Sequence, residues 1–97
     1  MRRLSVEPVA EAEIFEAFEW YRARSTIVAR AFRDTLDATL VTVGENPEQF
    51  PVVHRDIRRA LLPNFPYAAF FVVDLELIRV VGVLHGKRHP RRWQRRR

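Results

Sequence analysis

The sequence predicts an α+β fold in which a helical hairpin packs on a twisted antiparallel sheet, with the element order β-α-α-β-β-β. Two observations support this fold. Apolar residues recur every three or four positions from Pro8 to Val43 with one break at Ser25, which is typical of two amphipathic helices. After Pro47 the spacing changes to alternation and to runs of aromatic and branched residues, which is typical of strands. Strands that follow a helical pair favour the α+β class.

The first strand and the first helix lie at the N-terminal end. Leu4 and Val6 alternate with polar neighbours, so residues 2–6 are expected to form a short strand. Pro8 suits the first turn of a helix, where its missing N–H costs nothing, and this helix should run to about residue 24. Its apolar stripe contains Ala10, Ile14, Ala17, Phe18 and Tyr21, while Trp20 lies off the stripe.

A second helix is expected to begin after Ser25, whose hydroxyl can accept a hydrogen bond from a free backbone N–H of the first turn. Gly44 and Pro47 predict its end. Its stripe contains Val28, Ala31, Phe32, Thr35, Leu36, Thr39, Leu40 and Val43. Because almost no linker separates the two helices, they should form an antiparallel hairpin.

Three more strands are expected in the second half of the chain. Residues 52–62 alternate and should form one strand, with Arg55, Ile57, Arg59 and Leu61 on one face and His54, Asp56, Arg58 and Ala60 on the other. Residues 67–73 should form a buried strand, residues 74–76 a hairpin turn and residues 77–84 the last strand. Residues 90–97 are compatible with either a short helix or a loose tail.

Length and composition limit the class of protein. With 97 residues the chain should form one domain, 1–97, that ends in a basic C-terminal tail, 85–97. The absence of cysteine excludes a disulfide scaffold and a thiolate metal site. The chain has no apolar run of the ~18 residues that a membrane span requires and no apolar core of a signal peptide, so we expect a cytoplasmic protein.

Positive charge is concentrated at one end of the chain. Residues 1–84 hold ten Arg and twelve Asp or Glu, whereas residues 85–97 hold seven basic residues and no acid. A terminal basic block of this kind favours an acidic partner or a polyanion. The alternative is a tail that only keeps the protein soluble.

No constellation for catalysis or metal binding stands out. The three histidines, His54, His85 and His89, lack the spacing of a zinc site, because Pro90 opposes the helix that would align the last two. Ser25 is better explained as a helix cap, so a Ser-His-Asp triad is not expected. A glycine-rich phosphate loop is also absent from the sequence. We therefore expect no metal, no cofactor and no confident catalytic residue.

Several short motifs follow one another along nearly the whole chain. They are Glu11-Ala12-Glu13, Trp20-Tyr21, Ala31-Phe32, Asn46-Pro47-Glu48, Arg58-Arg59, Phe65-Pro66-Tyr67 and Val83-Leu84-His85-Gly86-Lys87-Arg88-His89-Pro90, followed by Trp93. In this order they resemble the RelE/ParE superfamily, the small toxins of bacterial type II toxin–antitoxin modules. The resemblance implies the same helical hairpin on a twisted antiparallel sheet.

The resemblance implies one of two activities. RelE-like members are ribosome-dependent mRNA endoribonucleases, whereas ParE-like members inhibit DNA gyrase by protein binding. Arg88 and Arg59 match basic positions of the superfamily. However, Ala68 stands where many members carry an arginine, Leu61 stands near another cation of the ribonucleases, and Trp93 or Gln94 occupies the region of their tyrosine. The incomplete set favours a ParE-like toxin that is not an enzyme.

The resemblance also implies the partners and the residues that contact them. We expect DNA gyrase as the target and a cognate acidic antitoxin that forms a hetero-oligomer with the chain. Target binding is assigned to Arg59, Tyr67, Lys87, Arg88, Arg91, Arg92 and Trp93. Antitoxin binding is assigned to Trp20, Tyr21 and Phe32, although Trp20 could equally only close the helical hairpin.

Under the ribonuclease alternative the ribosome and mRNA are the partners, and the catalytic residues are Arg59, His85 and Arg88. A small nucleic-acid-binding module is a third interpretation.

Overall fold

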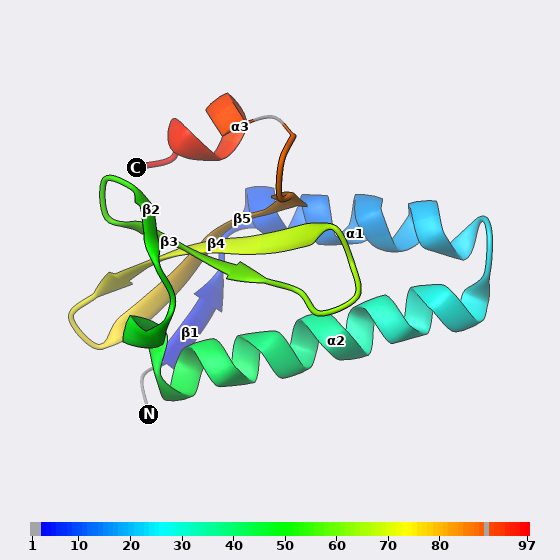
Figure 1. Cartoon of the computed structure of the whole chain (residues 1–97), viewed down its shortest axis with the longest axis horizontal. Coiled ribbons are helices and arrows are strands. Elements are labelled where there is room, and N and C mark those ends of the chain that lie inside the picture. The colour runs from blue at the N-terminus through cyan, green and yellow to red at the C-terminus, as the bar shows by residue number, and fades with distance from the viewer. Residues whose placement is uncertain (1–2, 89) are drawn as a thin grey trace.

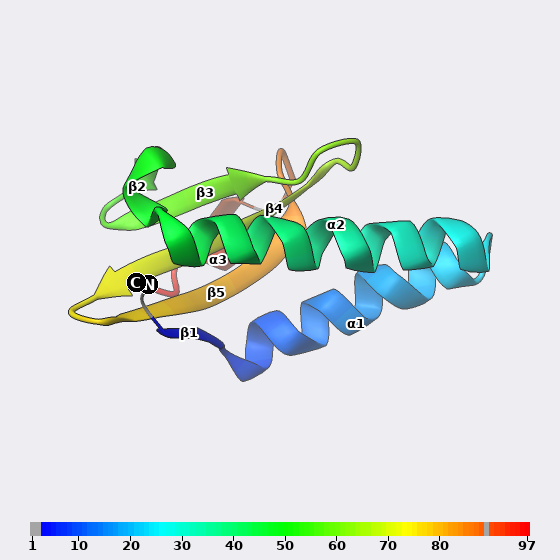
Figure 2. The ribbon, with the colours of Figure 1, turned by 90° about the horizontal axis from the view of Figure 1, so that it is seen from below.

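A five-stranded sheet lies at the centre of the molecule, with two long helices on one face and a short C-terminal helix on the other (Figures 1 and 2). The computed structural model describes residues 3–88 and 90–97. The order of the strands across the sheet is β1-β5-β4-β3-β2. This architecture confirms the predicted α+β fold.

The first half of the chain forms β1 (Arg3–Val6), α1 (Pro8–Arg22) and α2 (Thr26–Glu45). The helices pack side by side as the predicted hairpin (Figure 2). Ser25 is the N-cap of α2, and its hydroxyl accepts a hydrogen bond from the Val28 amide at 3.2 Å. Residue 2 of the predicted first strand lies outside the described residues.

The predicted end of the second helix at Gly44 is wrong by one residue. Gly44 is buried within α2, and no glycine among the described residues has a positive φ. The chain instead leaves the helix at Asn46, whose backbone is no longer helical, and Pro47 begins a single 3-10 turn, η1 (Pro47–Gln49). Gly44 therefore continues the helix and does not reverse the chain.

The single strand predicted over residues 52–62 is two strands in the structure. These are β2 (Val52–His54) and β3 (Ile57–Leu61), which pair antiparallel around a tight turn. Arg55 forms the turn with a left-handed backbone, φ 53°, a conformation that glycine and asparagine adopt more readily than arginine. The sequence thus lacks the usual signal for a hairpin at this point.

The strands β4 (Tyr67–Asp74) and β5 (Leu77–His85) form the longest pair of the sheet, joined through Leu75, which has φ 45°. From β2 to β5 all neighbours are antiparallel, as predicted. The strand β1 differs, because it pairs with β5 in parallel. Parallel neighbours require a long crossover connection, which the helical hairpin and the following strands provide.

The sheet is buried on both faces. Ala69 and Phe71 of β4 pack toward the helical hairpin, with Phe32 and Leu36 of α2 in the same core. Phe70 and Val72 face the opposite side, toward the short helix α3 (Pro90–Gln94). This double burial explains the unbroken apolar run of β4, which a half-exposed strand would not require.

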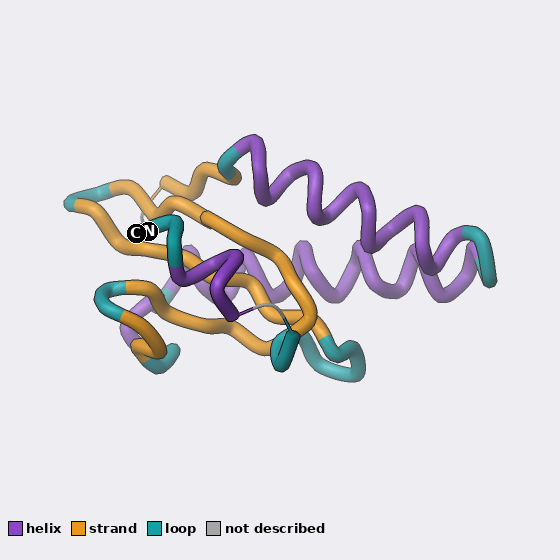
Figure 3. Tube along the Cα trace, turned by 90° about the horizontal axis from the view of Figure 1, so that it is seen from above, coloured by secondary structure: helices purple, strands orange, loops and turns teal. Residues whose placement is uncertain are grey.

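The last residues fold back onto the sheet (Figure 3). The side chain of Trp93 in α3 is only 6% exposed and stacks on Phe70, with 4.2 Å between the ring centroids and 12° between the ring planes. Of the two predicted possibilities for residues 90–97, the short helix is therefore correct. Within the described residues no helix is long and apolar enough to cross a membrane.

Candidate functional site

A groove of about 370 Å³ lies between α1, the start of β4, the end of β5 and α3. We call it the α1 groove. It is lined by Glu13, Glu16, Ala17, Trp20, Tyr21, Pro66, Tyr67, Val83, Leu84, His85, Arg88 and Arg92. The groove thus brings two residues predicted for antitoxin binding, Trp20 and Tyr21, beside three predicted for target binding, Tyr67, Arg88 and Arg92.

Aromatic rings build one end of the α1 groove. Tyr21 contacts Phe65 with 5.3 Å between ring centroids and Tyr67 with 6.2 Å. Burial raises the pKa of the Tyr21 hydroxyl above its usual value, and the neighbouring Tyr67 raises it further. For Tyr67, burial raises the pKa, Glu16 raises it further, and Arg88 lowers it. Both hydroxyls therefore stay protonated near neutral pH and can donate hydrogen bonds.

Trp20 lies at the rim of the groove and exposes 52% of its surface. The Arg24 guanidinium lies 3.6 Å from the centre of its ring and also donates a hydrogen bond to the Trp20 carbonyl at 2.7 Å. Stacking of a cation on the indole fixes its orientation while leaving its other side open. Such a preordered, exposed aromatic ring is suited to anchoring a partner.

Phe32 does not reach the surface. Its side chain is fully buried beneath Tyr21, with 5.3 Å between the ring centroids. Its position on the stripe of α2 places it in the core between hairpin and sheet. The structure therefore gives Phe32 a supporting role under Tyr21, with no area to offer an antitoxin.

The residues predicted for target binding are dispersed. Lys87 and Arg88 are exposed in the turn after β5, and Arg88 lines the α1 groove. Trp93, on the inner side of α3, is only 6% exposed and therefore presents little surface to a partner. Arg59 lies on β3 opposite Phe70, and its Nε is buried without a hydrogen-bond partner among the described residues.

The ribonuclease set is only partly assembled. His85 and Arg88 both line the α1 groove, and the His85 Nδ1 accepts a hydrogen bond from the Lys87 amide at 3.3 Å. Arg59 is not part of this groove. The three residues therefore share no common cavity, and His89 lies outside the described residues. Among residues 3–88 and 90–97 no cluster of potential ligands could hold a metal ion.

Glu13 is buried, although its sequence position predicts a solvated surface glutamate. The side chain is 5% exposed, and Oε1 accepts hydrogen bonds from the Val83 amide at 3.0 Å and from Arg96 at 2.9 Å. Oε2 accepts a second hydrogen bond from Arg96 at 2.9 Å, with Arg92 at 3.4 Å. Glu13 thus anchors the C-terminal segment on α1 and β5.

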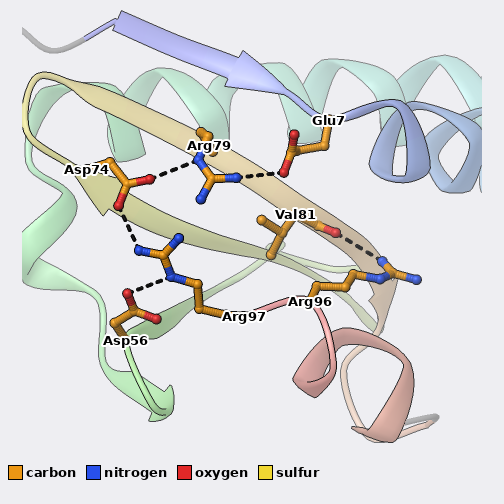
Figure 4. A network of polar contacts seen from close by, with 7 residues as sticks. All are labelled: Glu7, Asp56, Asp74, Arg79, Val81, Arg96 and Arg97. Carbon is orange, nitrogen blue, oxygen red and sulfur yellow. Dashed lines mark hydrogen bonds and ion pairs between the residues drawn. The ribbon is translucent and has the colours of Figure 1, made fainter.

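A second network fixes the end of the chain (Figure 4). Arg97 donates hydrogen bonds to Asp56 and to Asp74, each at 2.8 Å. Asp74 also accepts from Arg79 at 2.9 Å, and Arg79 donates to Glu7 at 2.8 Å. The basic tail is therefore not a uniform cationic strip, because Arg96 and Arg97 are neutralised by acids of the domain. Sequence alone could not reveal these pairs, since the partners lie far apart along the chain.

A second concavity, of about 500 Å³, lies between the β2–β3 turn and α3. It is lined by His54, Arg55, Arg91, Gln94, Arg95 and Arg97. Arg91 is therefore separated from the other residues predicted for target binding. The two concavities share no lining residue.

Comparison with known proteins gives concordant results. The sequence model of the family described as ParE toxin of type II toxin-antitoxin system, parDE, matches residues 4–90. Toxin ParE2 of Mycobacterium tuberculosis, from strains CDC 1551 / Oshkosh and ATCC 25618 / H37Rv, is 29% identical over 90 residues, which are 92% of this chain and 86% of the relative. A solved structure, "Chromosomal ParDE TA system from P. aeruginosa", superposes with a TM-score of 0.78 at 17% identity and covers 88% of this chain and 96% of that chain. At this identity the likeness of the structures shows a shared fold.

Proposed function

We propose that this chain, which belongs to the ParE toxin family of type II toxin–antitoxin systems, inhibits DNA gyrase by protein binding and is neutralised by a cognate antitoxin. Membership of the family establishes the toxin class. The target and the residues that contact it are our proposal. Membership of the ParE family supports gyrase as the target, and the geometry of the α1 groove supports inhibition by protein binding.

The α1 groove has the features of a protein-binding site. It combines an exposed tryptophan, two protonated tyrosines and the cations Arg88 and Arg92. Aromatic residues and arginine contribute most of the binding energy at protein interfaces. The ribonuclease alternative requires Arg59 beside His85 and Arg88, and Arg59 lies outside this groove. Binding without chemistry is therefore the function that the groove supports best.

We further propose that the antitoxin occupies the α1 groove. An amphipathic acidic segment would place apolar side chains against Trp20 and Tyr21 and carboxylates beside Arg88 and Arg92. The solved structure with the same fold is described as a ParDE system. We therefore expect an antitoxin of the ParD type as the partner of this chain. Because the same groove holds the residues assigned to the target, a bound antitoxin would cover them.

A supercoiling assay tests the proposal. Purified chain is added to DNA gyrase, relaxed plasmid and ATP, and we expect supercoiling to stop, with recovery when the antitoxin is added. The double variant Arg88→Gln, Arg92→Gln should lose most of the inhibition. The double variant Arg30→Gln, Arg33→Gln removes the same charge from the exposed face of α2 and should inhibit like the unmodified chain.

Two results would overturn the proposal. One is normal supercoiling in the presence of excess folded chain. The other is rapid cleavage of mRNA after induction in cells while gyrase in extracts of those cells remains active, which would establish the ribonuclease alternative.

A further inference from the structure

The concavity between the β2–β3 turn and α3 is a cluster of positive charge that the proposed function leaves unexplained. We call it the arginine cup and define it by Arg55, Arg91 and Arg95, with His54, Gln94 and Arg97 completing its wall. The side chains of Arg55, Arg91 and Arg95 are exposed and form no ion pair or side-chain hydrogen bond within the described part of the chain. Their mutual repulsion is therefore uncompensated in the free protein.

The arginine cup is held by the fold. Arg55 forms the tight β2–β3 turn. Arg91 lies in α3, and Arg95 lies in the turn directly after it, where its amide donates a hydrogen bond to the Arg91 carbonyl at 3.3 Å. Trp93 anchors α3 on the sheet by stacking on Phe70 of β4. The three guanidinium groups are thus presented from two ordered segments, the β2–β3 turn and the C-terminal segment that begins with α3, which limits the conformational entropy lost on binding.

Acids of the domain do not cancel the charge of the arginine cup. Asp56 follows Arg55 in the turn, but both Asp56 and Asp74 are engaged by Arg97 at 2.8 Å. None of the six lining residues that the structure describes is acidic. The surface is therefore complementary to an anion that carries several negative charges at close spacing.

The lining also indicates the class of anion. An acidic protein segment is usually held by apolar or aromatic anchors as well as by charge, and none of the six lining residues is apolar. Single-stranded nucleic acids are held by exposed aromatic side chains that stack on bases. The one aromatic ring among the lining residues, His54, is partly buried and lies against Trp93 with 6.1 Å between the ring centroids, and Trp93 is itself covered by its contact with Phe70. What remains is contact with phosphates alone, which is how proteins bind the backbone of duplex DNA without reading its sequence.

We propose that the arginine cup binds the phosphodiester backbone of duplex DNA. This inference goes beyond the proposed function, since it concerns a separate surface and requires neither gyrase nor antitoxin. Bidentate hydrogen bonds from guanidinium groups to phosphate oxygens supply the contact. Because no base is read, the binding is independent of sequence and weakens steeply with salt.

The test measures binding of the purified full chain to a short labelled DNA duplex of mixed sequence at several salt concentrations, without gyrase. Each phosphate that is neutralised contributes about −0.9 to the slope of log K against log salt. The triple variant Arg55→Gln, Arg91→Gln, Arg95→Gln should therefore have a slope shallower by about 2.7 and an affinity lower by about tenfold or more at low salt. The variant with lysine at the same three positions should keep most of the slope.

A matched control removes three exposed arginines elsewhere, with Arg3→Gln, Arg30→Gln and Arg33→Gln, and should retain the slope of the unmodified chain. Circular dichroism of each variant checks that it is folded. An unchanged slope in the cup variant, or an equal loss in the matched control, would overturn the inference. Tighter binding of polyglutamate or of single-stranded RNA than of the duplex would also overturn it, because the site would then belong to a different class of partner. Since gyrase is absent, failure here leaves the supercoiling result unaffected.

Discussion

The carboxylate of Glu13 and the guanidinium of Arg96 form a bidentate ion pair between residues 83 positions apart, with both hydrogen bonds at 2.9 Å. Glu13 is almost fully buried, and its Oε1 also accepts the Val83 amide of β5. One side chain of α1 thus binds the central sheet and the C-terminal segment at the same time.

Replacing Glu13 with glutamine should destabilise the protein. The substitution leaves Arg96, whose side chain is only 18% exposed, without its acidic partner. Removal of one partner of a buried pair costs about 3–5 kcal/mol, and the partial exposure of Arg96 lowers the expected loss to about 2 kcal/mol. Chemical denaturation measures the free energy of unfolding. The exposed Glu11→Gln serves as control and should change stability by less than about 0.5 kcal/mol.

Replacement of the two tryptophans by alanine should lower the free energy of unfolding by very different amounts. Trp93→Ala removes a buried ring stacked on Phe70 and should lower the free energy of unfolding by about 3–5 kcal/mol. Trp20→Ala removes a ring that is half-exposed and should cost about 1 kcal/mol. Denaturation curves of the two variants provide the comparison, and equal losses of stability would contradict the packing described above.

Trp20→Ala should instead weaken binding of the antitoxin. If the α1 groove receives the antitoxin, loss of this anchor should reduce the affinity by about tenfold or more. The affinity is measured by calorimetric titration with the short acidic protein that we expect to be encoded beside this chain. Val41→Ala is a suitable control, because Val41 is similarly exposed but lies on α2, outside the groove. An unchanged affinity in folded Trp20→Ala removes Trp20 from the interface.

Stability should fall at alkaline pH because of the two tyrosines of the α1 groove. Burial raises the pKa of Tyr21 and Tyr67 in the folded protein above the usual 10.0. The folded state therefore holds these protons more tightly than the unfolded state, and this contribution to stability is complete below pH 10 and is lost as the pH rises through the folded-state pKa. The absorbance of the phenolate follows the titration. Tyr67→Phe should flatten the alkaline decline, whereas an unaltered decline would assign it to other groups.

Arg79 should influence the titration of Asp74 more than Arg97 does. The hydrogen bond from Arg79 is the largest cause of the lowered pKa of Asp74, and Arg97 lowers it by a smaller amount. Arg79→Gln should therefore raise the pKa of Asp74 toward 3.8 by more than Arg97→Gln does. The sign follows from a depressed folded-state pKa: the stabilising contribution is present above pH 3.8 and is lost in more acidic solution. Titration of the carboxyl carbon by NMR measures the order, and the reverse order would contradict it.

The helices and the two long strands were predictable because local signals define them. Ser25 caps a helix whose apolar residues recur with helical spacing, and Leu75 lies in the predicted turn between two strongly apolar strands. Arg55 is the opposite case. A left-handed turn at arginine has no local signal, so β2 and β3 were expected as one strand. Tertiary packing and not residue preference fixes that turn.

The candidate site was predictable only in part. Trp20, Tyr21, Tyr67 and Arg88 do meet in one groove. Sequence could not distinguish the exposed Trp20 from the buried Trp93, because each aromatic ring is compatible with both environments. Nor could the sequence identify the partners of Glu13, because an ion pair between residues far apart in the chain produces no recognisable spacing of residues. Only the folded structure shows which terminal arginines form ion pairs with acidic residues and which do not.

The parallel neighbour of β1 has a consequence for biosynthesis. The strand β1 is synthesised well before β5, its partner in the sheet, which follows some seventy residues later. Until β5 emerges, β4 also lacks its longest partner, and the α1 groove lacks the wall that β5 supplies. The sheet and the α1 groove are therefore completed together, in a late step that inserts β5 between β1 and β4.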